Sequence, residues 1–68
     1  MEYKAKKLIK LLKKNGWKLI RTNGSHNNFK KDGYDKIVTV PLHNKSLGIG
    51  IAKKILKDAN IESEEYHE

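Results

Sequence analysis

The sequence contains no cysteine, which excludes a disulfide framework and thiolate chemistry and fits a reducing compartment. No apolar stretch approaches the roughly 18 residues that a membrane-spanning helix needs, and the first residues lack the apolar core of a secretion signal. A chain of 68 residues has room for only one small core. We therefore expect a cytoplasmic protein whose chemistry takes place on an open surface or in a shallow cleft.

Acidic residues are scarce over most of the chain. Residues 1–57 hold all fifteen Lys and Arg residues but only three acids, a net charge of +12, whereas residues 58–68 hold five acids and no base, a net charge of −5. A charge of +12 exceeds the value of about 2 to 8 that solubility alone accounts for in a small domain, and it attracts polyanions through counterion release. We expect one domain over residues 1–61 with an acidic tail over residues 62–68, and we favour a nucleic acid as partner.

Two segments have the spacing of amphipathic helices. Residues 4–14 carry apolar side chains at i, i+3, i+4 and i+7 with lysines around the other face, and Gly16 ends this pattern because glycine adopts the left-handed conformation at low cost. Residues 49–59 repeat the pattern, and Asn60 is suited to the same left-handed position. The second apolar stripe consists of Ile51, Ala52, Ile55, Leu56 and Ala59.

Three short strands are expected between the helices, over residues 17–22, 25–30 and 36–40. Asn23-Gly24 joins the first two and is a strong hairpin signal, and Pro41 ends the third because it has no N–H for a ladder. The order α-β-β-β-α predicts an α+β fold. In this fold a three-stranded antiparallel sheet has both helices on one face and leaves the other face open.

The hairpin register determines which side chains share the open face, because a slip of one residue reverses them all. With a two-residue loop, the large apolar side chains divide between the two faces. With a three-residue loop they gather on the inner face, where each contributes about 1.5 to 3 kcal/mol by burial, so we favour this register. The open face then carries His26, Asn28 and Lys30. The predicted core consists of Leu8, Leu12, Trp17, Leu19, Phe29, Val38, Val40, Ile55 and Leu56.

Histidine is the residue type that both accepts and donates a proton near neutral pH. Of the three histidines, His67 lies in the tail, His43 lies in the loop after the third strand, and His26 follows the hairpin turn on the open face. A structural or merely exposed side chain is the plain alternative for each. No group of residues has the spacing of metal ligands, so we expect neither a metal nor another cofactor.

Chemistry without a metal on a polyanion indicates RNA cleavage. RNA supplies its own nucleophile, the 2′-hydroxyl, so a protein needs to add only proton transfer and positive charge. Arg21, Lys30 and Lys36 are candidates for phosphate contacts near His26. Trp17 could stack on a base, but directly after a helix end we favour packing in the core.

The sequence also resembles a known family. Residues 15–17 (Asn-Gly-Trp), Arg21 and residues 24–29 (Gly-Ser-His-Asn-Asn-Phe) resemble the Gly-Trp…Arg…Gly-Ser-His-x-x-Phe signature of the HicA family of mRNA interferase toxins. The second half of the family pattern follows in order and spacing in Thr39-Val40-Pro41, His43, Gly50 and residues 55–61. The resemblance covers essentially the whole chain. It departs at Gly48, where the family often has proline, and at Asn60, where glycine is usual.

The resemblance implies a fold like the double-stranded-RNA-binding domain and a toxin of a type II toxin–antitoxin system. It also implies ribosome-independent cleavage of mRNA by a metal-independent endoribonuclease, and a HicB-type antitoxin that covers the active site. His26 corresponds to the family's catalytic histidine, and Gly24 and Ser25 match the turn that presents it. We therefore expect His26 to be catalytic and RNA contacts from Arg21, Gly24, Ser25, Asn28, Lys30 and Lys36.

Two alternatives remain at this stage. A non-catalytic RNA-binding domain of the same fold would use Lys53 and Lys54, near the start of the second helix, to grip phosphates, but it would not need a histidine after the turn. A small protein-binding domain would carry its lysines only as a solvated face, and its contact with RNA would be weak and insensitive to salt.

Overall fold

The helices and strands follow the predicted order, and three short elements are added to it. The computed structural model describes residues 3–42 and 46–66, so His43 and His67 lie outside the described residues. Within those residues no helix is long and apolar enough to cross a bilayer. The elements are β1 (Tyr3–Lys4), α1 (Ala5–Lys14), β2 (Lys18–Asn23), β3 (His26–Lys30), β4 (Val38–Pro41), β5 (Ser46–Leu47), α2 (Ile49–Asp58) and the 3-10 turn η1 (Ser63–Glu65).

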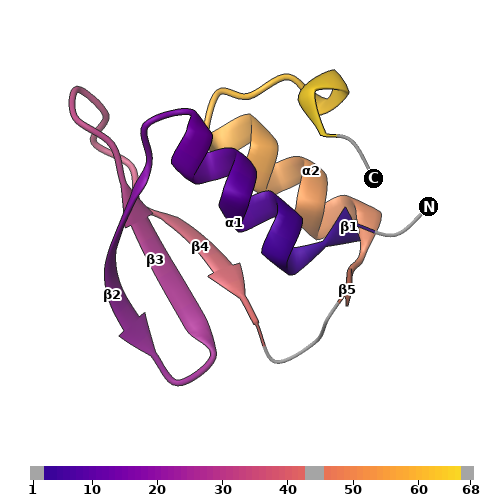
Figure 1. Cartoon of the computed structure of the whole chain (residues 1–68), viewed down its shortest axis with the longest axis horizontal. Helices are drawn as coiled ribbons and strands as arrows, with labels where there is room; N and C mark the ends of the chain where they lie inside the picture. Colours follow the sequence, from indigo (N-terminus) through magenta and orange to yellow (C-terminus); the bar gives the residue numbers. More distant parts are fainter. Residues whose placement is uncertain (1–2, 43–45, 67–68) are drawn as a thin grey trace.

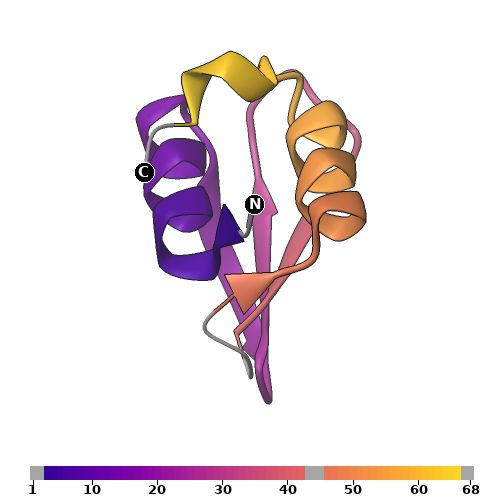
Figure 2. The ribbon, with the colours of Figure 1, turned by 90° about the vertical axis from the view of Figure 1, so that its right-hand side faces the viewer.

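The three central strands form an antiparallel sheet in the order β2-β3-β4, and both helices lie on one side of it (Figures 1 and 2). Burial alternates along β3 and β4, with Phe29, Val38 and Val40 buried between more exposed neighbours. This alternation is the mark of a sheet that packs on one face only. The predicted α+β fold, with two helices on one face, is confirmed.

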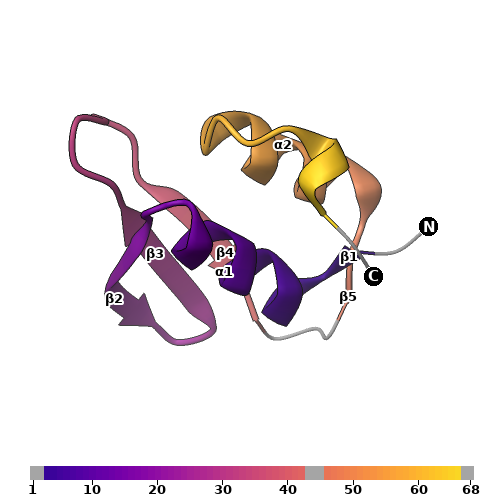
Figure 3. The ribbon, with the colours of Figure 1, turned by 45° about the horizontal axis from the view of Figure 1, so that its top comes forward.

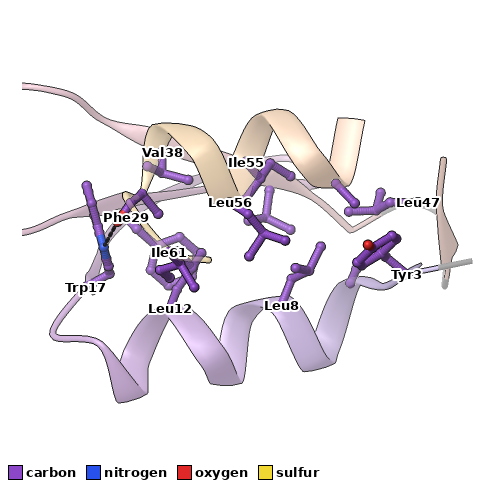
Figure 4. Close-up of a cluster of buried hydrophobic side chains, with 14 residues drawn as sticks. Tyr3, Leu8, Leu12, Trp17, Phe29, Val38, Leu47, Ile55, Leu56 and Ile61 are labelled. Carbon is purple, nitrogen blue, oxygen red and sulfur yellow. Dashed lines mark hydrogen bonds between the residues drawn. The ribbon is translucent and has the colours of Figure 1, made fainter. Parts of the chain in front are cut away.

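The core lies between the helices and the inner face of the sheet (Figure 4). Trp17 is 1% exposed, which confirms the prediction that it packs rather than stacks on a base. Two of the predicted positions are wrong. Leu19, predicted in the core, is 46% exposed, and Ile51, predicted in the apolar stripe of α2, is 53% exposed. The buried apolar set comprises Tyr3, Ala5, Leu8, Leu12, Trp17, Phe29, Val38, Val40, Leu47, Ala52, Ile55, Leu56, Ala59 and Ile61.

Both helices end in the same hydrogen-bonded motif. Trp17 N–H donates to the Leu12 carbonyl at 3.0 Å, five residues back, and Ile61 N–H donates to the Leu56 carbonyl at 2.9 Å. Residues Gly16 and Asn60, just before these donors, have φ angles of +94° and +57°. This is the Schellman motif, in which the residue after the left-handed position packs back on the last turn. Asn60 therefore takes the left-handed role predicted for it.

A second small sheet closes the end of the fold near the chain termini. β1 pairs antiparallel with β5, with Tyr3 opposite Leu47. After η1, the Tyr66 ring packs on the Tyr3 ring with centroids 4.7 Å apart, and the Tyr66 hydroxyl accepts the Lys4 N–H at 2.8 Å. Two-residue strands carry no periodicity, so this closure was not foreseen.

Leucine-to-alanine substitutions test the assignment of the core. We expect Leu12→Ala to lower the free energy of unfolding by about 2 to 5 kcal/mol, because it opens a cavity in a packed core. Leu19→Ala removes the same atoms from a half-exposed position and should cost much less. Urea denaturation of the two variants measures both effects. Equal losses would mean that Leu19 is buried in the core and would contradict its half-exposed position at the edge of the sheet.

Candidate nucleic-acid interface

A two-residue turn precedes His26. Gly24 and Ser25 form it, and Asn23 pairs with His26. Of the two turn residues only Gly24 has a positive φ, +57°, the pattern of a type II′ hairpin turn. The Asn23-Gly24 signal thus marks the right hairpin, but the loop lies one residue later.

A β-bulge at Ile20 allows the two-residue turn to coexist with the strand register that was predicted for a three-residue loop. At the far end of the hairpin Leu19 pairs with Phe29, as predicted for a three-residue loop. Between Leu19 and Arg21 the register shifts by one residue, so Arg21 and Asn23 lie on the face of His26. Without the bulge, Arg21 would lie on the helix side of the sheet.

The turn is held from both sides by hydrogen bonds to its Ser25 carbonyl. The Leu42 N–H donates to it at 2.7 Å from the end of β4, and the Asn27 side chain donates to it at 3.4 Å. The Asn27 side-chain oxygen in turn accepts the Thr22 hydroxyl proton at 3.3 Å. Asn27 is only 9% exposed, so a buried amide ties the turn to both flanking strands.

His26 itself is exposed at the start of the central strand. It pairs with Asn23 of β2 on one side and with Pro41 of β4 on the other. Because successive side chains in a strand point to opposite faces, the imidazole lies on the face away from the helices. The backbone that carries it is therefore fixed, while the ring is open to a large ligand.

Arg21 and Asn28 share this face with His26. Arg21 lies diagonally across the strand pair, a relation that places Cβ atoms about 7 to 8 Å apart and within reach of a long side chain. The Thr39 hydroxyl donates to the Asn28 side-chain oxygen at 2.6 Å, and the Asn28 amide donates to the Arg21 carbonyl at 3.5 Å. These contacts link all three strands beside the histidine.

The two predicted lysine contacts lie farther away. Lys30 is on the same face, but four residues along β3 correspond to about 13 Å, and it pairs with Lys18 at the other end of the sheet. Lys36 precedes β4, with its ammonium 3.9 Å from the Asp58 carboxylate of α2. The structure therefore groups Arg21, Gly24, Ser25 and Asn28 around His26, extends the face to Lys30, and leaves Lys36 outside the group.

The charged side chains of this face are all positive. β2, β3 and β4 contain Lys18, Arg21 and Lys30 and not one acidic residue. In residues 3–42 and 46–66, no three histidine or acidic side chains come close enough together to hold a metal ion. An anionic strand laid across this face would meet cations, amides and hydroxyls, together with the apolar ring of Pro41 beside His26.

Two polar residues of this region were missed by the sequence reasoning. Thr39 contacts Asn28 across the face, and Asn27 anchors the turn from the inner side. Alternation from Phe29 places Asn27 inside, but a buried asparagine is uncommon. Only the coordinates show the partners that satisfy it.

A family described as HicA toxin of bacterial toxin-antitoxin matches residues 5–61. The matched range begins at the first residue of α1 and ends at Ile61, which closes the Schellman motif of α2. It therefore includes both helices, the three-stranded sheet and every residue grouped around His26. No curated protein sequence matches the chain.

Two single substitutions test whether Asn27 anchors the turn. Asn27→Ala removes two side-chain hydrogen bonds worth about 0.5 to 1.5 kcal/mol each, so we expect a loss of about 1 to 3 kcal/mol in unfolding free energy and faster amide exchange at Leu42. Thr39→Val removes one hydrogen bond on the exposed face and should leave the exchange at Leu42 unchanged. Urea denaturation and hydrogen exchange measure the two effects. Unchanged exchange in Asn27→Ala would contradict the anchoring role.

Proposed function

The chain belongs to the HicA family of toxins, and on that premise we propose that it is an endoribonuclease that cleaves mRNA with His26 and without a metal ion. As a toxin of a toxin–antitoxin system it has an antitoxin partner. One observation carries the proposal: a single exposed histidine is held by a fixed turn on a sheet face that is free of acids. A purely structural role gives no reason for an exposed imidazole at that position.

The proposed reaction uses the substrate's own nucleophile. The 2′-hydroxyl attacks the adjacent phosphorus, the 5′ oxygen leaves, and the products are a 2′,3′-cyclic phosphate and a 5′-hydroxyl. The reaction needs one proton taken from the 2′-hydroxyl and one delivered to the 5′ oxygen. His26 moves one of these two protons, a contribution that is worth about 10²- to 10⁴-fold in rate.

The neighbouring residues bind and orient the phosphate. Arg21 supplies a fixed positive charge and several N–H donors within reach of His26, which suits the extra negative charge of the phosphorane. The amide of Asn28 and the N–H groups of the turn residues Gly24 and Ser25 add neutral donors. Lys30 holds the RNA backbone farther along β3, and Lys36 takes a more distant phosphate.

We also propose how the activity is controlled and where it acts. A HicB-type antitoxin that covers the open sheet face would block His26 and Arg21 together. Its contact surface would need negative charge to complement a face whose charged side chains are all positive. Because the substrate is mRNA, we assign the protein to the cytoplasm.

Cleavage of a single-stranded RNA in the presence of EDTA tests the proposed reaction. We expect the wild-type protein to leave 2′,3′-cyclic phosphate ends and His26→Ala to lose about 10²-fold or more of the rate, because one proton transfer is lost. Product ends are identified by mass spectrometry, and rates by gel electrophoresis.

His67→Ala is the matched control, since it removes a second histidine from the acidic tail. We expect it to cleave at the wild-type rate. Salt-sensitive RNA binding by all three proteins with no cleavage by any of them would instead identify a non-catalytic RNA-binding domain. Cleavage that stops in EDTA would contradict a reaction without metal.

A further inference from the structure

The outer side of α1 carries a second group of positive side chains. This helix covers one side of the sheet (Figure 2), and His26 lies on the other side. We define its lysine face as Lys6, Lys7, Lys10, Lys13 and Lys14. Counted from Lys6, the other four lie one, four, seven and eight positions further on, so all five fall on one side of the helix, away from the buried Leu8 and Leu12. Lys6, Lys10, Lys13 and Lys14 are exposed, and Lys7 is half-buried.

The lysine face lowers the intrinsic stability of α1, for two reasons. Its lysines are like-charged neighbours at i+3 and i+4, an arrangement that destabilises a helix. The first turn contains no acid, although acids there would suit the helix dipole. Among the described acids, none forms an ion pair with Lys6, Lys10, Lys13 or Lys14. A helix that only needed solubility would mix both signs, so this face indicates an anionic partner.

An open groove runs along one margin of this face. Lys7, Lys10 and Lys14 line it together with the half-buried Leu11. The opposite wall is formed by Glu65 and Tyr66 of the C-terminal segment, which Tyr66 fixes against Tyr3. The groove therefore has cations along its helix side and an apolar base. Among the described residues, Glu65, whose carboxylate accepts the Glu62 N–H at 3.3 Å, is the one acid that lines it.

We infer that the lysine face of α1 is a second RNA-docking surface, which binds the phosphate backbone of the same substrate outside the catalytic face. This inference rests on the proposed function and extends it. Lys6 and Lys14 are eight residues apart, about 12 Å along the helix axis, so the face can neutralise several consecutive phosphates. Two joined contacts raise the affinity for a long RNA by making the second contact intramolecular. A dinucleotide reaches only the catalytic face and gains nothing from α1.

The test variant is Lys6→Gln/Lys10→Gln/Lys14→Gln in a His26→Ala background, with affinity for a long single-stranded RNA measured across a salt series. Each phosphate contact contributes about 0.7 to the slope of log affinity against log salt for single strands. Three lost contacts should lower the slope by about 2 and the affinity by about 100-fold at 0.1 M salt. Glutamine is a good helix former, and circular dichroism checks that α1 remains folded.

The matched control is Lys53→Gln/Lys54→Gln/Lys57→Gln, which removes three exposed lysines from α2. We expect a much smaller loss of affinity. Equal losses in the two triple variants would show that affinity follows net charge and would overturn the inference. So would a loss of antitoxin binding in the α1 variant with unchanged RNA affinity, because the lysine face would then bind a protein.

The dinucleotide separates this inference from the proposed function. With His26 present, the α1 triple variant should cleave a dinucleotide at the wild-type rate and a long RNA at low concentration more slowly. Wild-type protein that cleaves the dinucleotide, combined with an α1 variant that binds long RNA normally, would overturn the second surface alone. Wild-type protein that neither binds nor cleaves RNA would overturn both proposals.

Discussion

The buried indole of Trp17 joins the three parts of this fold at one point. Its backbone N–H completes the C-terminal motif of α1, and its ring N–H donates to the Ala59 carbonyl after α2 at 3.3 Å (Figure 4). The ring also packs on Tyr34, in the loop between β3 and β4, with centroids 5.4 Å apart. The Tyr34 hydroxyl accepts the Asn60 amide at 3.3 Å. Both helices are thereby fixed to one face of the sheet, and the other face stays uncovered.

The uncovered face can attract a polyanion because its three strands contain basic residues and no acids. The described acids lie in the β3–β4 loop, at the end of α2 and around η1, whereas the strands and α1 carry none. A polyanion that approaches the sheet face or α1 therefore meets cations first, which favours fast association. The same distribution leaves few ion pairs among the described residues. The single ion pair between described residues, Lys36–Asp58, is 3.9 Å long and solvent-exposed, and such pairs contribute little.

Much of the fold follows from local patterns. The spacing of Leu8 and Leu12 is enough to predict α1, and a left-handed Asn60 follows from the position where the second apolar stripe ends. The exposure of Leu19 could not be predicted in the same way. Leu19 pairs with Phe29 and so shares its face, but every residue of the edge strand β2 is exposed, and a period of two does not show how far the helices cover the sheet. The bulge at Ile20 depends on the two-residue turn, which depends in turn on hydrogen bonds to Ser25 from Asn27 and from Leu42, seventeen residues later. Long-range contacts of this kind have no signal in a short window of sequence.

The residues grouped around His26 also divide into those that the sequence predicts and those that it does not. The position of His26 just after a turn, on the open face, follows from the sequence, and Asn28 follows from alternation. Arg21 reaches that face only because of the bulge, and Lys36 is drawn toward Asp58 by a contact between two elements far apart in the chain. Side chains set by alternation are predictable, and side chains set by a register shift or by tertiary contact are not.

The contact between Tyr3 and Tyr66 brings the first and last described residues of the chain together. Together with the β1–β5 pair it brings residues 62 positions apart into hydrogen-bond contact, on the side of the molecule away from the β2–β3 hairpin (Figures 1 and 3). Since loop closure costs little for a short linker, a short linker could join Tyr66 to Tyr3, and the chain could be opened instead in the loop between β3 and β4 without cutting a strand. In such a circular permutant the three strands and two helices would keep their neighbours.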